Sequence, residues 1–162
     1  MSLHSHYWKK DLLKRSSVIS DKVKHQRWGD EAIMILEQVI TLGFYSIQRL
    51  LKENLISHKL TNKKFTILKY PALTPDGTIV RSHEVHNHFD LHKSGKTNKN
   101  SLFLCHQFLQ SHYLEFTYDQ KKHPLSIYVS SEKSKNKEVY KIDLKQIIEI
   151  FNEVGEDNLS AI

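Results

Sequence analysis

The feature that most constrains the fold is a long apolar stretch over residues 31–57. Apolar residues recur there at spacings of three and four, which is the period of an α-helix. They are Ile33, Leu36, Ile40, Phe44, Ile47, Leu51 and Leu55. Val39, Leu42 and Leu50 widen this stripe until it nearly encircles the helix. Since such a helix must be packed on several sides, the stretch predicts the central core element, in which Gly43 either permits a close approach or is simply tolerated.

The residues on either side of this stretch predict two further helices and a sheet. A first helix is expected over residues 7–26, where apolar residues alternate with lysines at near-helical spacing. After residue 64 the pattern becomes extended, and strands are expected at 65–70, 79–92, 114–118, 125–130 and 138–142, the last three as an antiparallel meander. A short buried helix is expected over 101–112. A last helix is expected between the N-cap residue Asp143 and a stop at Gly155.

Together these elements predict a single α+β domain over residues 1–162, with residues 1–6 and 156–162 frayed. N-terminal helices would pack with an antiparallel sheet of about five strands, a short inner helix and a C-terminal helix. The chain is expected to reverse at residues 75–77, and residues 93–100 are expected to form a polar loop. The triplet at residues 95–97 lacks the spacing of a phosphate-binding loop, which excludes that interpretation.

Residues 83–92 form the densest group of titratable side chains, with the sequence HEVHNHFDLH. In an extended segment, side chains alternate between two sides, so five polar residues would share one side. They are Glu84, His86, His88, Asp90 and His92. Because imidazoles beside carboxylates occur in metal sites and in acid–base chemistry, this segment is the candidate functional region.

A metal site here would use His86, His88 and Asp90 as ligands of a divalent ion. His86 and His92 would lie about 20 Å apart on a straight strand, so one ion cannot bind the whole row. The remaining ligands would come from other segments, with His106, His112 and Asp119 as candidates. The run from His86 to His92 resembles the HxHxDH zinc signature of metallo-β-lactamase-type hydrolases. The inserted Leu91 and the short chain depart from that family, so its site is not carried over.

A half-exposed strand explains the same residues without any ligand. Val85, Phe89 and Leu91 would then face the core, and the polar residues would face water. Because the ordinary pKa of imidazole is about 6.5, such a face would gain positive charge in mild acid. The segment is therefore also a candidate for a pH-sensitive surface or for a partner interface.

The net charge of +6 is concentrated in two basic zones. Residues 1–27 and residues 57–100 each carry a clear excess of lysine and arginine over acidic residues. Such zones attract nucleic acid or another acidic surface. The chain has few arginines for a protein that reads phosphates or bases: Arg15, Arg27, Arg49 and Arg81. The identity of the partner therefore stays open, with a protein and a nucleic acid as the two candidate classes, and no membrane partner is expected.

Cys105 is the only cysteine, so no internal disulfide can form. It lies about 10.5 Å along a helix from His112, too far for a thiolate–imidazole pair, and a buried inert thiol is expected. The N-terminus lacks the apolar region of a signal peptide, and Glu37 and Gln38 interrupt the most apolar stretch. We therefore expect a soluble, cytoplasmic protein.

Three short runs resemble small bacterial proteins of unknown function: residues 43–51, residues 104–107 and residues 111–113. The resemblance covers about two-thirds of the chain in the order of its elements and implies no activity. HEPN nucleases place an arginine shortly before a catalytic histidine on a helix. The helix expected before His112 has no such arginine, so their chemistry is not transferred.

The sequence favours a non-enzymatic binding or accessory protein that uses a basic or histidine-bearing surface and needs no cofactor. The alternative is a metal-dependent hydrolase or nuclease built on His86, His88 and Asp90, with a metal-bound water as the nucleophile.

Overall fold

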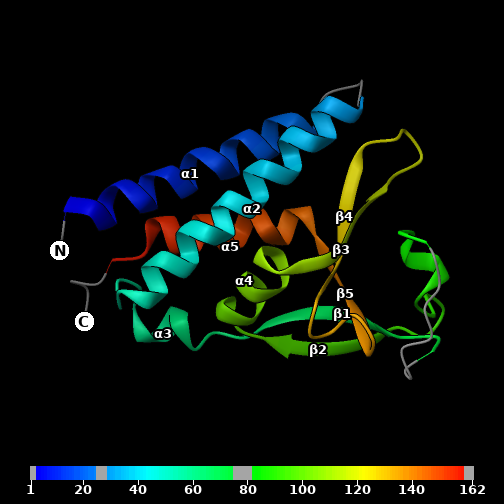
Figure 1. Ribbon diagram of the computed structural model, residues 1–162. Helices are drawn as coiled ribbons and strands as arrows, with labels where there is room; N and C mark the ends of the chain where they lie inside the picture. Colours follow the sequence, from blue (N-terminus) through cyan, green and yellow to red (C-terminus); the bar gives the residue numbers. More distant parts are fainter. Residues whose placement is uncertain (1–2, 25–28, 75–81, 159–162) are drawn as a thin grey trace.

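The long apolar helix lies at the centre of the structure, as its sequence predicts. The computed structural model describes residues 3–24, 29–74 and 82–158. Helix α2 (Asp30–Lys52) buries an apolar stripe formed by Leu36, Ile40, Phe44, Ile47 and Leu50. It packs against α1 (Leu3–Val23), α4 (Ser101–Leu109) and α5 (Leu144–Glu156) (Figure 1). The helix ends earlier than expected because Asn54 adopts a φ of 56°, and a separate short helix, α3 (His58–Thr61), follows.

In the described residues, five antiparallel strands form one sheet in the order β2-β1-β5-β4-β3. The strands are β1 (Phe65–Pro71), β2 (Gly95–Lys99), β3 (Ser111–Tyr118), β4 (Pro124–Ser131) and β5 (Glu138–Asp143). The last three form the predicted meander, and β1 extends it by pairing with β5. The predicted α+β class is therefore confirmed.

The two faces of the sheet are covered by different parts of the chain. On the inner face, alternate side chains join the main core beneath the helices: Phe65, Ile67, Phe116, Ile127, Val129, Tyr140 and Ile142. On the outer face, Tyr70 and Val139 pack with Val85 and Phe89 of the segment 82–92. Figure 1 shows the helices on one side of the sheet and this segment, in green, on the other.

The predicted strand over residues 79–92 is wrong for the part of it that the structure describes. Residues 79–81 lie outside the described residues, as does the predicted reversal at residues 75–77. From residue 82 the chain is irregular, with a short 3-10 helix at Val85–Asn87 and a single β-bridge at Phe89. Val85 and Phe89 are four residues apart and both enter the outer-face cluster. A spacing of four residues places two side chains on the same side of one helical turn and also on the same side of a strand. The sequence pattern therefore fits both, and the packing of this segment decides which one forms.

The polar run at residues 93–100 was expected as a loop but supplies the edge strand β2. Its residues 95–99 pair with β1. The backbone makes these hydrogen bonds, and an edge strand tolerates lysine and polar side chains because one side of it is open to solvent. The polar composition of residues 93–100 therefore led to the prediction of the second strand in the wrong segment.

Helix α1 begins at Leu3, within the residues 1–6 that the sequence predicts as frayed, and Ser5 is fully buried. None of the helices in the described part of the chain combines the length and apolar character needed to cross a bilayer.

Helix α5 begins after Asp143 as predicted, although that side chain makes no capping hydrogen bond. The expected stop at Gly155 is wrong, because the helix continues to Glu156. A side chain at Gly155 would overlap Leu13 of α1, so this glycine provides space for helix packing. The next residue, Asp157, is held by hydrogen bonds and is not part of a frayed tail.

Candidate functional site: the outer face of the sheet

The histidine-bearing segment, residues 82–92, is fixed to the outer face of the sheet by its apolar and backbone groups. The side chains of Val85 and Phe89 are each 1% exposed, and the Phe89 ring meets Tyr113 edge-on at 5.4 Å. The backbone N–H of Val85 donates to the carboxylate of Glu115 at 2.9 Å. These contacts hold the segment against β3 while most of its polar side chains remain exposed.

His86 and His88 point to different surroundings. His86 is exposed on the 3-10 helix, with its Nε2 3.3 Å from a carboxylate oxygen of Glu84. His88 is half-buried, with its Nε2 2.6 Å from the carbonyl oxygen of Ser82 and its ring 4.9 Å from the ring of Tyr113. The expectation that the polar residues share one side fails because the segment is not a strand.

Asp90 is also engaged locally, since its carboxylate accepts the backbone N–H of His92 at 3.1 Å. The His92 side chain is exposed. Among the residues that the structure describes, no three His, Cys, Asp or Glu side chains are placed to hold a metal ion. The structure therefore does not bring His86, His88 and Asp90 together as a ligand set.

Of the further candidate ligands, His112 is the one that comes close to the segment. Its Nδ1 lies 2.8 Å from the carboxylate of Glu132, and its ring contacts Tyr113 at 4.7 Å. His88 contacts the same tyrosine ring. Hydrogen bonds from Lys135 and then from His112 lower the pKa of the Glu132 carboxyl. The His112–Glu132 pair is thus an exposed hydrogen-bonded pair next to Tyr113, which the segment also contacts.

His106 and Asp119 lie elsewhere. His106 is exposed on α4, on the helical side of the sheet. Asp119 lies in the turn between β3 and β4, where it accepts backbone N–H groups of Lys121 and His123. The bond from His123 is the largest cause of the lowered pKa of the Asp119 carboxyl. Asp119 therefore stabilises its own turn.

A row of side chains crosses all five strands on the outer face. Cross-strand pairing places in one line Lys96, Leu68, Lys141, Tyr128 and Glu115. The ammonium group of Lys141 lies 5.5 Å from the centre of the Tyr128 ring, a cation–π contact. Burial and then the neighbouring Tyr70 raise the pKa of the Tyr128 hydroxyl above its ordinary value.

A hollow of about 170 Å³ opens beside this row. Lys96, Lys141 and Asp143 line it together with Thr66 and Gln146, whose amide donates to the Thr66 carbonyl at 3.1 Å. Two ammonium groups and one carboxylate leave the hollow positively charged. The hollow can therefore attract an acidic group.

The residues that anchor and extend this surface were missed from the sequence. Tyr113 and Glu115 on β3 contact the segment, and Lys141 and Tyr128 form the open row. The signal was present in the alternation of the strands, which assigns each residue to a face. The alternation does not show which of the two faces of the sheet the histidine-bearing segment covers.

Cys105 is buried and inert, as predicted. Its thiol donates to the carbonyl oxygen of Phe44 at 3.3 Å, and burial raises its pKa from 9.0 to about 12. Because the thiol ionises at a lower pH in the unfolded chain than in the folded protein, the contribution of the neutral thiol to stability depends on pH. It is fully present below pH 9 and is lost as the pH rises towards 12.

On raising the pH from about 8 to about 10, we expect the wild type to lose about 1.4 kcal/mol more stability than Cys105→Ala, measured by urea unfolding. Parallel pH dependence of the two proteins would contradict this prediction.

No family model, curated protein or solved structure matches the chain. The resemblance to small bacterial proteins stays a prediction. The functional interpretation below uses the geometry of the chain itself.

Proposed function

We propose that the protein is a non-enzymatic accessory protein that binds an acidic partner through the outer face of its sheet. The observation that best supports this is the anchored segment 82–92, which presents exposed histidines next to the open row with Lys96 and Lys141. An anchored surface loses little conformational entropy when it binds, and its cations complement acidic groups.

An acidic protein surface is the favoured partner, ahead of nucleic acid. Both cations in the hollow are lysines, which act as compact point charges. Proteins that read phosphates and bases rely on the planar fork of arginine. The described outer-face row carries no arginine, which favours attraction by charge over recognition of bases.

Charge reversal at the open row tests this proposal. Poly-glutamate serves as an acidic polypeptide probe and a single-stranded oligonucleotide as a nucleic-acid probe, both measured by fluorescence anisotropy at low and at physiological salt. We expect poly-glutamate to bind in a salt-sensitive way, with at least about tenfold weaker affinity for the Lys96→Glu/Lys141→Glu double variant. The matched control Lys10→Glu/Lys14→Glu reverses two exposed charges on α1 and should change affinity less than about twofold.

Each result of this experiment decides something. Equal loss of binding in both double variants would mean that net charge alone is responsible, which contradicts the outer-face proposal. Tighter binding of the oligonucleotide would identify nucleic acid as the partner class. If neither probe binds at low salt, the proposal is overturned.

The alternative of a metal-dependent hydrolase predicts a different result. It needs His86, His88 and Asp90 to share an ion, and the described geometry keeps their side chains in separate contacts. Elemental analysis of protein purified without a histidine tag distinguishes the two functions. Stoichiometric zinc, manganese or iron that disappears in His88→Ala would favour the hydrolase.

A further inference from the structure

The sheet has an open edge at strand β2. Among the residues that the structure describes, β2 pairs with β1 alone and is the outermost strand on its side of the sheet (Figure 1). Its register with β1 is regular along its whole length. The opposite edge strand, β3, shifts its register near both ends, and the segment 82–92 packs against it. Since register shifts disrupt a ladder and a regular edge can accept a further strand, β2 is the edge that is open to pairing.

Hydrogen bonds just beyond the end of β1 show how its backbone groups alternate. In an antiparallel sheet, successive residues direct their N–H and C=O groups to opposite neighbours. The N–H of Ala72 donates at 2.8 Å to the carbonyl of Lys137, on the β5 side. The carbonyl of Pro71 accepts at 2.9 Å from the N–H of Asp90, on the other side. The odd-numbered residues of β1 therefore bond to β2.

This alternation identifies the free backbone groups of β2. The residues opposite the odd positions of β1 are Gly95, Thr97 and Lys99, and their N–H and C=O groups bond to β1. Lys96 and Asn98 consequently direct their N–H and C=O groups away from the sheet. Both residues have exposed side chains. The edge thus offers two N–H donors and two C=O acceptors to an added strand.

The charge of this edge selects the kind of strand that it can accept. Residues 93–100 contain Lys93, Lys96 and Lys99 and no acidic residue. Lys96 lines the positively charged hollow of the outer face and forms no ion pair with any residue that the structure describes. A second copy of β2 would bring like charges together, which disfavours self-pairing. An acidic strand would instead place its carboxylates beside these lysines.

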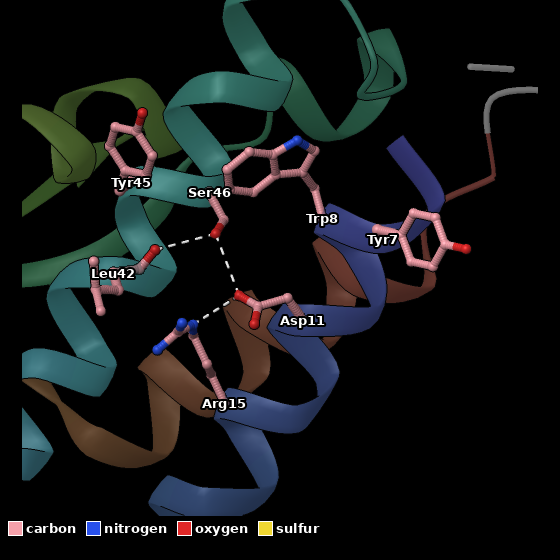
Figure 2. Close-up of a pocket in the computed structure, with 7 residues that line it drawn as sticks. All are labelled: Tyr7, Trp8, Asp11, Arg15, Leu42, Tyr45 and Ser46. Atoms are coloured by element: carbon pink, nitrogen blue, oxygen red, sulfur yellow. Dashed lines mark hydrogen bonds and ion pairs between the residues drawn. The ribbon is translucent and has the colours of Figure 1, made fainter. Parts of the chain in front are cut away.

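The groove between α1 and α2 lacks this property, because its charges are already satisfied. The two charged side chains that line it are Asp11 and Arg15. Figure 2 shows the Arg15 guanidinium directed at Asp11, to which it donates at 2.7 Å. The Ser46 hydroxyl lies 3.4 Å from the same carboxylate. That groove identifies no partner, whereas the β2 edge offers both unpaired charge and free backbone groups.

We propose that β2 binds an extended acidic segment of a partner protein, which adds to the sheet as a further strand. This inference rests on the proposed function and names the form in which the acidic partner is recognised. The added strand is antiparallel, as are all neighbouring strands in the described sheet. Its alternate side chains lie on the outer face beside Lys96 and are acidic. Main-chain hydrogen bonds give the affinity, and charge gives the selectivity.

The first test compares two peptides of equal charge by fluorescence anisotropy. One is a labelled peptide of alternating glutamate and threonine, in which threonine favours the extended conformation. The other carries an N-methyl group on each glutamate, which removes the N–H donors that would face β2 and leaves the carboxylates intact. We expect the N-methylated peptide to bind the wild type at least about tenfold more weakly.

The second test changes one backbone group of the protein. Asn98→Pro removes an outward N–H donor, and proline is tolerated on an edge strand where its nitrogen faces solvent. We expect this variant to bind the unmodified peptide at least about tenfold more weakly. Asn98→Ala is the matched control, because it keeps the N–H and should change affinity less than about twofold. Far-UV circular dichroism checks that both variants are folded.

Amide hydrogen exchange of the wild type tests the same contact without any substitution. With peptide bound, the amides of Lys96 and Asn98 should exchange at least about tenfold more slowly, measured by NMR. The amide of Thr97 already bonds to β1 and should change less. This alternating pattern is expected for an added strand, whereas attraction by charge alone would leave the outward amides unprotected.

The outcomes separate this inference from the proposed function. Equal binding of the two peptides, or a bound peptide that leaves the amides of Lys96 and Asn98 unprotected, would overturn strand addition. The proposed function would still stand if poly-glutamate loses affinity for the Lys96→Glu/Lys141→Glu variant. If no acidic probe binds the wild type, the proposed function fails and strand addition fails with it.

Discussion

Replacing Asp157 with alanine is expected to lower the free energy of unfolding by about 3 kcal/mol. Its carboxylate accepts hydrogen bonds from the backbone N–H and the hydroxyl of Ser57, at 2.8 and 2.6 Å. The Lys9 ammonium lies 3.5 Å away and also donates to the Asp157 carbonyl oxygen. These contacts join α1, the loop before α3 and the end of α5.

The size of the effect follows from burial. The side chains of Lys9 and Asp157 are only 6% and 10% exposed. Loss of the carboxylate leaves a buried ammonium group without its counter-charge, and removal of one partner of a buried pair costs about 3–5 kcal/mol. Ser57 also loses an acceptor for two donors, although its hydroxyl remains as the cap of α3.

Urea unfolding followed by circular dichroism measures this loss. Glu153→Ala is the control, because Glu153 also joins α5 to a distant lysine, Lys63 at 2.7 Å, but in an exposed pair. An exposed pair contributes less than about 1 kcal/mol. Equal destabilisation by the two substitutions would show that Asp157 acts as an ordinary surface charge. Lys9→Met, which removes the charge and keeps the apolar stem, should cost less than Asp157→Ala.

The elements that the sequence predicts well are those defined by local periodicity. The apolar stripe of α2 and the alternation of β3, β4 and β5 both repeat over several turns or pairs. In each case the buried side chains lie close together in the sequence, and only one type of secondary structure brings all of them to the same side. The helices and the meander are therefore correct, with errors confined to their ends.

The errors concern residues whose partners are far away in the sequence. Asp157 was expected in a frayed tail because its partners Ser57 and Lys9 lie 100 and 148 positions away. The segment 82–92 was expected as a strand because nothing in it shows that Val85 and Phe89 cover the outer face. Strand β2 has no apolar pattern, since backbone pairing with β1 alone defines it. The candidate site includes the segment 82–92 and strand β2, which were both predicted wrongly. The contacts of this segment with β3 were therefore not predicted from the sequence.

Gly43→Ala is expected to lower the free energy of unfolding by about 2 kcal/mol. The sequence left open whether Gly43 is tolerated or permits a close approach, and the structure decides for the close approach. A Cβ at residue 43 would lie 2.2 Å from the ring of Phe151 on α5. In an open helix the same substitution would stabilise by about 1 kcal/mol through helix propensity, so even the sign of the change distinguishes the two interpretations.

The Phe151 ring cannot move aside without further cost. It is fully buried and meets the ring of Phe44 edge-on at 5.2 Å, and Phe44 in turn stacks on Phe108 at 4.4 Å. Phe151→Leu removes ring atoms and should cost about 1 kcal/mol alone, yet cost nothing or even restore stability in the Gly43→Ala background. A double-mutant cycle by urea unfolding should give a favourable coupling of at least about 1 kcal/mol. Additive effects would mean that α2 and α5 do not meet at this glycine.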